Sequence, residues 1–370
     1  MALPSARLPD FPWDSLAEVT ATARAHPDGL VDLSVGSPVD ATPEVAREAV
    51  ARAADAPGYP AVVGTPVLRA AIRGYLGRRW GVLGLADAGV MPSIGTKELV
   101  AWLPTLLGMG PADTVVIPEL AYPTYEVGAV LAGARVERCD DPGRVSGVPR
   151  LIWVNSPANP HGAVVPPARL REWVAFARDC GAVVASDECY LEFGWTGEHP
   201  VSLLDASVCG DDHRGLLAVH SASKWANFAG YRAGFVAGDP AVVAELVAVR
   251  KHAGMMVPTP VQAALRAVLD AAETVVPAQR ARYRARREAL APALQLAGFR
   301  IDASEGGLYL WATRGEPGRD SIAWLAGLGI LGAPGDFYGP AGGDHVRLAL
   351  TATDERIEAA VGRLSQALAG

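Results

Sequence analysis

One lysine in this chain is surrounded by side chains suited to holding a phosphate. Lys224 lies in the run SASKWANFAGYRAG, with Ser221 and Ser223 just before it and Arg232 eight residues later. A lysine amine can condense with an aldehyde to form a Schiff base. The two hydroxyls and the guanidinium, which can bind two oxygens at once, are suitable donors to a phosphate. Taken alone, the run fits a strand end and a surface loop equally well, so its interpretation depends on other segments.

Two other segments place polar side chains directly after apolar runs. Asn159 lies in the turn NSPANPHG, and Asp187 and Tyr190 lie in DECY. Ligands of open α/β sheets bind at the carboxyl ends of strands. A carboxylate there is either a helix cap or a buried charge that needs a cationic partner. A protonated pyridine nitrogen is such a partner, and keeping it cationic makes the ring an electron sink. Each segment alone fits an ordinary turn, but together with the lysine they indicate pyridoxal phosphate.

Composition excludes several classes of protein. The chain has 370 residues, half of them hydrophobic and a fifth charged, which is ordinary for a soluble globular enzyme. Its net charge of −7 argues against nucleic-acid binding, which needs clustered positive charge. The arginine-rich run RARYRARR, residues 280–287, is the exception, and we expect it to form the solvated face of a helix.

The four cysteines and the apolar segments indicate the compartment. The cysteines form no CxxC pair, so we expect neither a zinc site nor a disulfide framework. The first residues lack the pattern of a signal peptide, and no apolar segment reaches the roughly 18 residues of a membrane span. We therefore expect a protein of the reducing cytoplasm that binds no metal, nucleic acid or membrane.

Short apolar runs alternate with longer amphipathic ones through most of the chain. Near-continuous apolar runs predict strands covered on both faces. Strand–helix alternation predicts a mainly parallel sheet wrapped by helices. The last hundred residues show instead the pattern of a smaller α+β unit. We predict a large domain over residues 33–275 and a small domain formed by residues 1–32 and 276–370. The predicted strands are residues 113–117, 150–155, 182–186 and 216–220.

The order of short motifs along the chain resembles that of the class I/II (fold type I) aminotransferases. The motifs are GTK, NPxG, DxxY, SxSK and RxG, and the resemblance covers nearly the whole chain. It implies an α/β fold with a large, mainly parallel α/β/α sheet domain and a smaller α+β domain. It also implies that Lys224 carries pyridoxal 5'-phosphate and moves the substrate's proton. Asp187 would pair with the pyridine nitrogen, Asn159 and Tyr190 would contact the ring oxygen, and Ser221, Ser223 and Arg232 would hold the phosphate.

The same resemblance assigns further cofactor contacts. Gly95, Thr96 and Lys97 open a helix, where backbone N–H groups favour an anion, so we expect them at the phosphate. Tyr122 occupies the position of the family's ring-stacking aromatic, although it also fits an ordinary strand–helix turn. Tyr59 resembles the tyrosine that reaches the phosphate of the neighbouring subunit, which implies a homodimer. Otherwise Tyr59 is a loop residue with its hydroxyl in water.

Arg347 lies in the otherwise apolar run HVRLAL. A buried arginine without a partner is very costly, so it must meet an anion. That anion is either an internal Asp or Glu, or the α-carboxylate of a substrate, as the family resemblance implies. Gly36, which has no side chain, would let that carboxylate approach the backbone, and Asn159 would help to bind the substrate.

The substrate is predicted from longer phrases. SVGSPVD, GLYLWATRG, APGDFYG and LALTATDER are similar to those of actinobacterial N-succinyldiaminopimelate aminotransferases of lysine biosynthesis. The resemblance implies N-succinyl-LL-2,6-diaminopimelate and glutamate as amino donors and 2-oxoglutarate as the 2-oxo acid. One departure is Trp225-Ala226, where a basic-polar pair is expected. This departure indicates either a less anionic substrate or a pocket wall that is packed differently.

Two alternatives remain open from the residues, and a third is disfavoured by them. One is a sister aminotransferase of specialised metabolism with another amino-acid substrate. Another is a lyase or oxidase that uses the same cofactor and the same surrounding residues. A non-catalytic binding protein would be expected to lack Lys224 or Asp187, and both are present.

Overall fold

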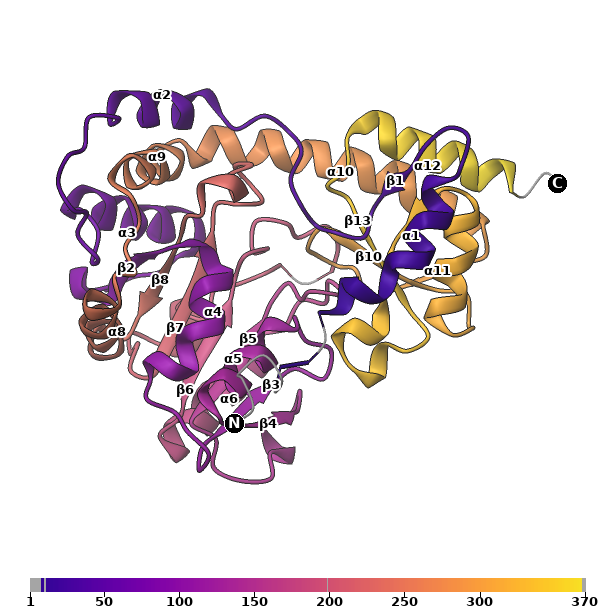
Figure 1. Cartoon of the computed structure of the whole chain (residues 1–370). Helices are drawn as coiled ribbons and strands as arrows, with labels where there is room; N and C mark the ends of the chain where they lie inside the picture. The colour runs from indigo at the N-terminus through magenta and orange to yellow at the C-terminus, as the bar shows by residue number, and fades with distance from the viewer. Residues whose placement is uncertain (1–7, 10, 198, 368–370) are drawn as a thin grey trace, which may run out of the picture.

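The computed structural model describes residues 8–9, 11–197 and 199–367. Its centre is a seven-stranded sheet of order β2-β8-β7-β6-β5-β3-β4 (Figure 1). β8 is antiparallel to both of its neighbours, and the other pairings are parallel. The strands are β2 (Val90–Ser93), β3 (Thr114–Ile117), β4 (Arg135–Arg138), β5 (Leu151–Asn155), β6 (Val183–Asp187), β7 (Leu216–Ser221) and β8 (Gly234–Gly238). The four strands predicted from apolar runs are confirmed to within one residue at each end.

Helices cover both faces of this sheet because successive strand residues point to opposite sides. Val115 and Ile117 pack with the helices α4, α5 and α8, whereas Val116 packs with α3 and α6. The mainly parallel, helix-covered sheet that was predicted is therefore confirmed. These helices, with the short α7, are α3 (Pro66–Trp80), α4 (Gly95–Leu106), α5 (Thr124–Ala132), α6 (Pro167–Cys180), α7 (Ala206–Cys209) and α8 (Pro240–Ala253).

The carboxyl ends of three neighbouring strands form the edge where the candidate residues gather. In the register of the sheet, Asn155 at the end of β5 lies opposite Asp187 at the end of β6. β7 lies beside β6 and ends at Ser221, just before Lys224. The parallel arrangement thus brings residues from three separate segments to one edge.

The C-terminal part is built on an antiparallel sheet of order β12-β13-β10-β9. The N-terminal strand β1 joins this part, because it pairs in parallel with β11. In Figure 1 this part lies at the right, with α1, α11 and α12 around it. The elements are α1 (Ala17–Arg24), β1 (Val31–Asp32), β9 (Arg300–Asp302), β10 (Tyr309–Thr313), α11 (Gly318–Gly327), β11 (Ile330–Leu331), β12 (Ala333–Pro334), β13 (Val346–Ala349) and α12 (Asp354–Gln366).

The remaining helices are α2 (Glu44–Arg52), α9 (Thr259–Asp270) and the long α10 (Ala272–Leu296). α9 packs against α2 and α3, whereas α10 runs from α9 to α12 and β9 of the C-terminal part. The predicted domain boundary between residues 275 and 276 lies inside α10, which is continuous there. The two-domain division stays a prediction.

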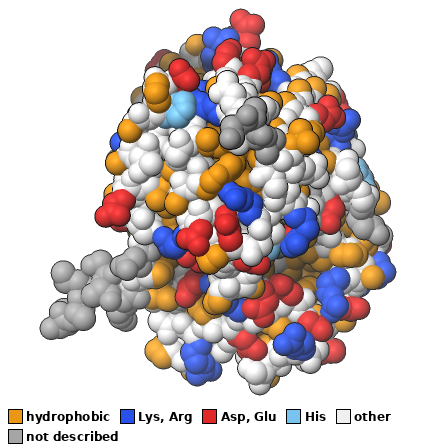
Figure 2. Space-filling view, turned by 90° about the vertical axis from the view of Figure 1, so that its right-hand side faces the viewer, with side chains coloured by type: hydrophobic (Ala, Val, Ile, Leu, Met, Phe, Trp, Pro, Cys, Tyr) orange, Lys and Arg blue, Asp and Glu red, His pale blue; other side chains and the backbone are white. Residues whose placement is uncertain are grey.

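The arginine-rich run 280–287 lies on α10, but the predicted solvated face is wrong for part of it. Arg286 is only 3% exposed, because its guanidinium is bound by Asp40 and Asp354, each at 2.6 Å. Figure 2 shows acidic and basic side chains interspersed over the described part of the face on the C-terminal side. Within the described ranges, no helix combines the length and the apolar character needed to cross a membrane.

Candidate active site

Lys224 lies in the turn after β7 and reaches across to another segment. Its amine Nζ donates a hydrogen bond to the carbonyl of Gly36. The hydroxyl and ring of Tyr309 lie so close to Gly36 that a Cβ atom there would collide with them. A side chain at position 36 would therefore displace Tyr309, so a glycine suits the position whose carbonyl meets the lysine.

Asp187 ends β6 and is almost completely buried. Its Oδ2 accepts a hydrogen bond from the Tyr125 hydroxyl at 2.9 Å, and its Oδ1 accepts one from the Cys189 backbone N–H at 3.1 Å. Burial raises the pKa of Asp187. Both donors are neutral, so the carboxylate fits a cationic group such as a protonated pyridine nitrogen.

Tyr125 was missed by the sequence reasoning. Its ring stacks on Trp153 with centroids 4.8 Å apart, which fixes the hydroxyl at Asp187. Tyr122, two residues before α5 begins, meets Tyr125 edge to face at 5.7 Å. Burial raises the pKa of Tyr122 to about 12. The available signal was a second tyrosine three residues after Tyr122, at the junction between β3 and α5.

The groups predicted to bind the phosphate gather at the start of α4. The Ser221 hydroxyl donates to the Ser223 hydroxyl at 2.7 Å. Arg232 has a left-handed backbone (φ 55°), and its guanidinium lies against Gly95, where a Cβ atom would collide with it. Gly95, with φ 69°, is the first residue of α4. A helix start, an arginine and serine hydroxyls together fit a phosphate.

Thr96 and Lys97 continue this helix start in different ways. Thr96 accepts a hydrogen bond from the Cys189 thiol at 3.3 Å, which ties α4 to the Asp187 segment. The Lys97 amine points instead toward the Phe11 ring, 5.9 Å from its centroid. Only the backbone N–H of Lys97 remains as the predicted phosphate contact.

Arg347 on β13 is 3% exposed, and its hydrogen bonds go to neutral groups. Nη1 donates to the Asn159 side-chain oxygen at 2.8 Å, and Nη2 donates to the Ser34 carbonyl at 2.7 Å. The rings of Tyr309 and Tyr338 lie 4.0 and 4.9 Å from the guanidinium carbon. Its bonded partners are thus not an internal Asp or Glu, and its charge fits an incoming carboxylate.

Tyr190 is connected to Arg347 through Tyr309, a residue that the sequence reasoning did not single out. Its hydroxyl shares a hydrogen bond of 2.9 Å with that of Tyr309. Burial works against ionisation of Tyr309, but the charges of Arg347 and Lys224 outweigh it and lower the pKa of Tyr309. The available signal was the aromatic phrase GLYLWA, which had been used only for the substrate.

Two predicted features lie outside this cluster. Tyr59 is 98% exposed in the loop before α3. Trp225 is 3% exposed and stacks on Tyr75 with centroids 5.7 Å apart, and Ala226 is fully buried. The Trp225-Ala226 pair is thus packed into the core, which favours the repacked-wall interpretation.

Comparisons with known proteins bear on this arrangement. The chain is 62% identical over 362 residues to a probable aminotransferase of Mycobacterium tuberculosis, covering 98% of this chain and 86% of that protein. It is 57% identical over 359 residues to the 4-dedimethylamino-4-oxo-anhydrotetracycline transaminase of Streptomyces rimosus, covering 97% and 99%. It is also 30% identical over 380 residues to an LL-diaminopimelate aminotransferase of Dehalococcoides mccartyi, covering 97% and 96%.

A solved structure and a family profile also match this chain. An aminotransferase of Neisseria meningitidis superposes with a TM-score of 0.86 at 28% identity, over 99% of this chain and all of that one. The profile of the family "Aminotransferase class I and II" matches residues 28–364. The chain belongs to the class I/II aminotransferases, enzymes of fold type I that depend on pyridoxal phosphate.

Proposed function

We propose that this aminotransferase moves an amino group between N-succinyl-LL-2,6-diaminopimelate and 2-oxoglutarate, with glutamate as the other amino acid. One observation carries the central part of the proposal, the transamination of an α-amino acid. Arg347 and Lys224 bind the same short segment, at the carbonyls of Ser34 and Gly36. A substrate whose α-carboxylate lies on Arg347 therefore has its Cα beside the lysine amine.

The residues of the sheet edge would hold the cofactor. Asp187 would bind its ring nitrogen, Tyr122 would stack on the ring, and Asn159 and Tyr190 would contact the ring oxygen. The phosphate would be bound by Ser221, Ser223, Arg232, Gly95, Thr96 and the backbone of Lys97. When bound, the ring supplies an electron sink for charge that develops at the substrate Cα.

The chain's own groups then perform the proton transfer. Lys224 accepts the proton from the substrate Cα and gives it up again as the amino group is transferred. Arg347 holds the carboxylate at two oxygens and so keeps the Cα in reach. The same two groups serve the second acid, because an amino acid and a 2-oxo acid carry the same carboxylate.

Substrate identity is supported by the sequence phrases shared with N-succinyldiaminopimelate aminotransferases, and the LL-diaminopimelate relative points to the same class of amino acid. In this interpretation the enzyme acts in lysine biosynthesis. Trp225 stacks on Tyr75 and Ala226 is fully buried, so we interpret this pair as a repacked wall and keep a substrate with remote carboxylates.

A second candidate is transamination of a polycyclic ketone. The relative from Streptomyces rimosus, whose name gives 4-dedimethylamino-4-oxo-anhydrotetracycline, is matched over 99% of its length. The rings of Tyr309 and Tyr338 beside Arg347 would suit a flat aromatic substrate. A substrate of this kind would place the chain in specialised metabolism.

The test is the visible absorbance band of the purified protein with pyridoxal phosphate. L-glutamate and N-succinyl-LL-2,6-diaminopimelate are each added alone. Loss of the band with both supports the proposal. Loss with glutamate alone, followed by recovery when the tetracycline ketone is added, supports the second candidate. Persistence of the band with both amines would overturn the proposed substrates, and a Lys224→Ala variant serves as the control without the lysine amine.

A further inference from the structure

The segment that contains Gly36 and the loop that contains Lys224 meet at the lysine amine. Further hydrogen bonds join the same two segments several residues away. Asp40 lies four residues after Gly36, and Asn227 lies three residues after Lys224. The Thr42 hydroxyl donates to the Asn227 carbonyl at 2.9 Å, and the Asn227 amide donates to the Ala41 carbonyl at 3.3 Å. The relative position of the two segments is thus fixed by more than the lysine itself.

Helix α10 supplies the side chains that join them. Gln279 donates to the Asp40 carboxylate at 2.8 Å and accepts from the Asn227 amide at 2.8 Å. Arg286 binds both oxygens of Asp40, at 2.6 and 3.0 Å. The Tyr283 hydroxyl donates to the Lys224 carbonyl at 3.4 Å.

Helical spacing brings these groups to one face. Positions 279, 283 and 286 follow each other at intervals of four and three residues, so they share one side of α10. All three are 3% exposed or less. Burial opposes ionisation of Asp40, but the hydrogen bonds from Arg286 and Gln279 outweigh it and hold the pKa of that carboxyl below its usual value. A charged carboxylate is therefore maintained in the centre of the network.

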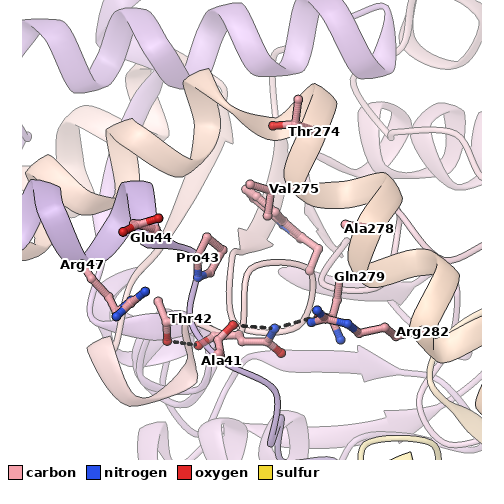
Figure 3. A pocket seen from close by; sticks show the side chains of 12 residues that line it. Ala41, Thr42, Pro43, Glu44, Arg47, Thr274, Val275, Ala278, Gln279 and Arg282 are labelled. Carbon is pink, nitrogen blue, oxygen red and sulfur yellow. Dashed lines mark hydrogen bonds between the residues drawn. The ribbon is translucent and has the colours of Figure 1, made fainter.

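The network also borders open space. Ala41 and Thr42 on one side and Gln279 on α10 line a pocket of about 380 Å³, which Figure 3 shows with the hydrogen bonds drawn. Asn227 lines it too. Its backbone is left-handed, with φ 49°, a conformation that asparagine tolerates better than most side-chain-bearing residues. The hydrogen bonds of its amide and carbonyl hold this part of the lysine loop in place.

We propose that Asp40, Asn227, Gln279 and Arg286, here called the clamp, are positioning residues that set where the Lys224 amine stands relative to Gly36 and the substrate carboxylate on Arg347. This inference rests on the proposed role of Lys224 in proton transfer. None of the four clamp residues is among those assigned to the substrate or the cofactor. The clamp acts through the two segments whose separation decides whether the amine reaches the Cα proton. A displacement of about 1 Å at such a distance costs on the order of 100-fold in rate.

The experiment compares two clamp variants with a matched control in the holoenzyme. Gln279→Met keeps the length of the side chain and removes its hydrogen bonds with Asp40, Asn227 and Arg282. Asp40→Asn keeps the shape and removes the charge. Asp354→Asn is the control, because it removes the other, 67% exposed carboxylate bound to Arg286 and leaves Asp40 in place.

Three quantities are measured on each protein. They are the single-turnover rate with saturating L-glutamate, the isotope effect with glutamate deuterated at Cα, and the visible circular dichroism of bound pyridoxal phosphate. We expect the clamp variants to react about 10- to 100-fold more slowly. Their isotope effect should rise, since proton transfer becomes slower than the other steps, and their visible dichroism should fall. Asp354→Asn should match the parent in all three.

The outcomes separate this inference from the proposed function. If the parent does not react with glutamate but the dichroism falls in Gln279→Met and not in Asp354→Asn, the clamp stands and the assigned donor is wrong. If the clamp variants lose only thermal stability, with rate, isotope effect and dichroism unchanged, the network is merely structural and the inference is overturned. Gln279→Met leaves the ion pair between Arg286 and Asp40 intact. If Asp40→Asn fails to fold, the result for Gln279→Met alone supports or overturns the inference.

Discussion

The Tyr125 hydroxyl donates to the Asp187 carboxylate across 2.9 Å inside the carboxyl edge of the sheet. Asp187 is thereby held in one orientation by a residue of α5, 62 positions earlier in the chain. A hydrogen bond to a charged group contributes about 1.5–3 kcal/mol. Tyr125 is thus a supporting residue for the proposed contact between Asp187 and the cofactor ring.

We expect Tyr125→Phe to weaken pyridoxal phosphate binding about tenfold, because the pKa of Asp187 would rise further and its charge would be lost more easily. The measurement is an absorbance titration of the apoprotein with cofactor. Tyr75→Phe is the matched control, since the Tyr75 hydroxyl donates to another carboxylate, Glu192, at 2.7 Å. Equal losses of affinity in both variants would contradict a specific role for Tyr125.

His161 should make the protein sensitive to acid. Burial, assisted by the charge of His345, lowers the pKa of His161 to about 4. Between about pH 6.5 and pH 4 the unfolded chain binds a proton that the folded chain does not. The free energy of unfolding therefore falls as the pH drops through this window, by about 3 kcal/mol at most.

The check is urea unfolding of the apoprotein at pH 7 and at pH 5. We expect His161→Gln to lose less stability than the parent between the two values, because an amide does not titrate there. Parallel losses in the parent and in the variant would show that His161 does not cause the acid sensitivity.

Tyr59 should act across a subunit boundary. Its side chain is 98% exposed, as expected of a residue that reaches away from its own chain. We expect light scattering to give twice the 38.6 kDa chain mass, and Tyr59→Phe to weaken cofactor binding about tenfold.

Hybrid dimers provide a sharper test of Tyr59. A mixture of Lys224→Ala and Tyr59→Ala chains forms a dimer in which one site has both an intact lysine and an intact tyrosine. Activity above the average of the two homodimers is expected. Additive activities would place the tyrosine in its own subunit or outside the site.

Trp225 should determine stability rather than substrate choice. Its ring is buried against Tyr75, so Trp225→Ala should cost about 3–5 kcal/mol of unfolding free energy. The ratio of KM values for glutamate and N-succinyl-LL-2,6-diaminopimelate should stay unchanged. Trp225→Phe, which keeps an aromatic ring, should lose less stability. A changed KM ratio at unchanged stability would place Trp225 at the substrate.

The ends of the central strands could be predicted from the sequence because they depend on local patterns. Continuous apolar runs mark strands that are covered on both faces. The polar residues that follow them, Asp187 and the run from Ser221, must therefore lie at one edge of a parallel sheet. Arg347 could be singled out in the same way, as a charge in an apolar strand that needs an anion.

The partners of these residues depended on which distant segments meet, and no local pattern contains that information. Arg286 was expected in solvent, yet it is buried against Asp40, 246 positions earlier in the chain. Tyr309 reaches Tyr190 across 119 positions.

The sequence alone therefore determined the family's motifs, the strand ends and the lysine between phosphate-binding groups, because each of these rests on neighbouring residues. Only the tertiary structure decided which neutral groups surround Asp187 and Arg347, and how α10 ties the lysine loop to Gly36. Burial and charge pairing are properties of the packed chain, and packing joins segments far apart in sequence.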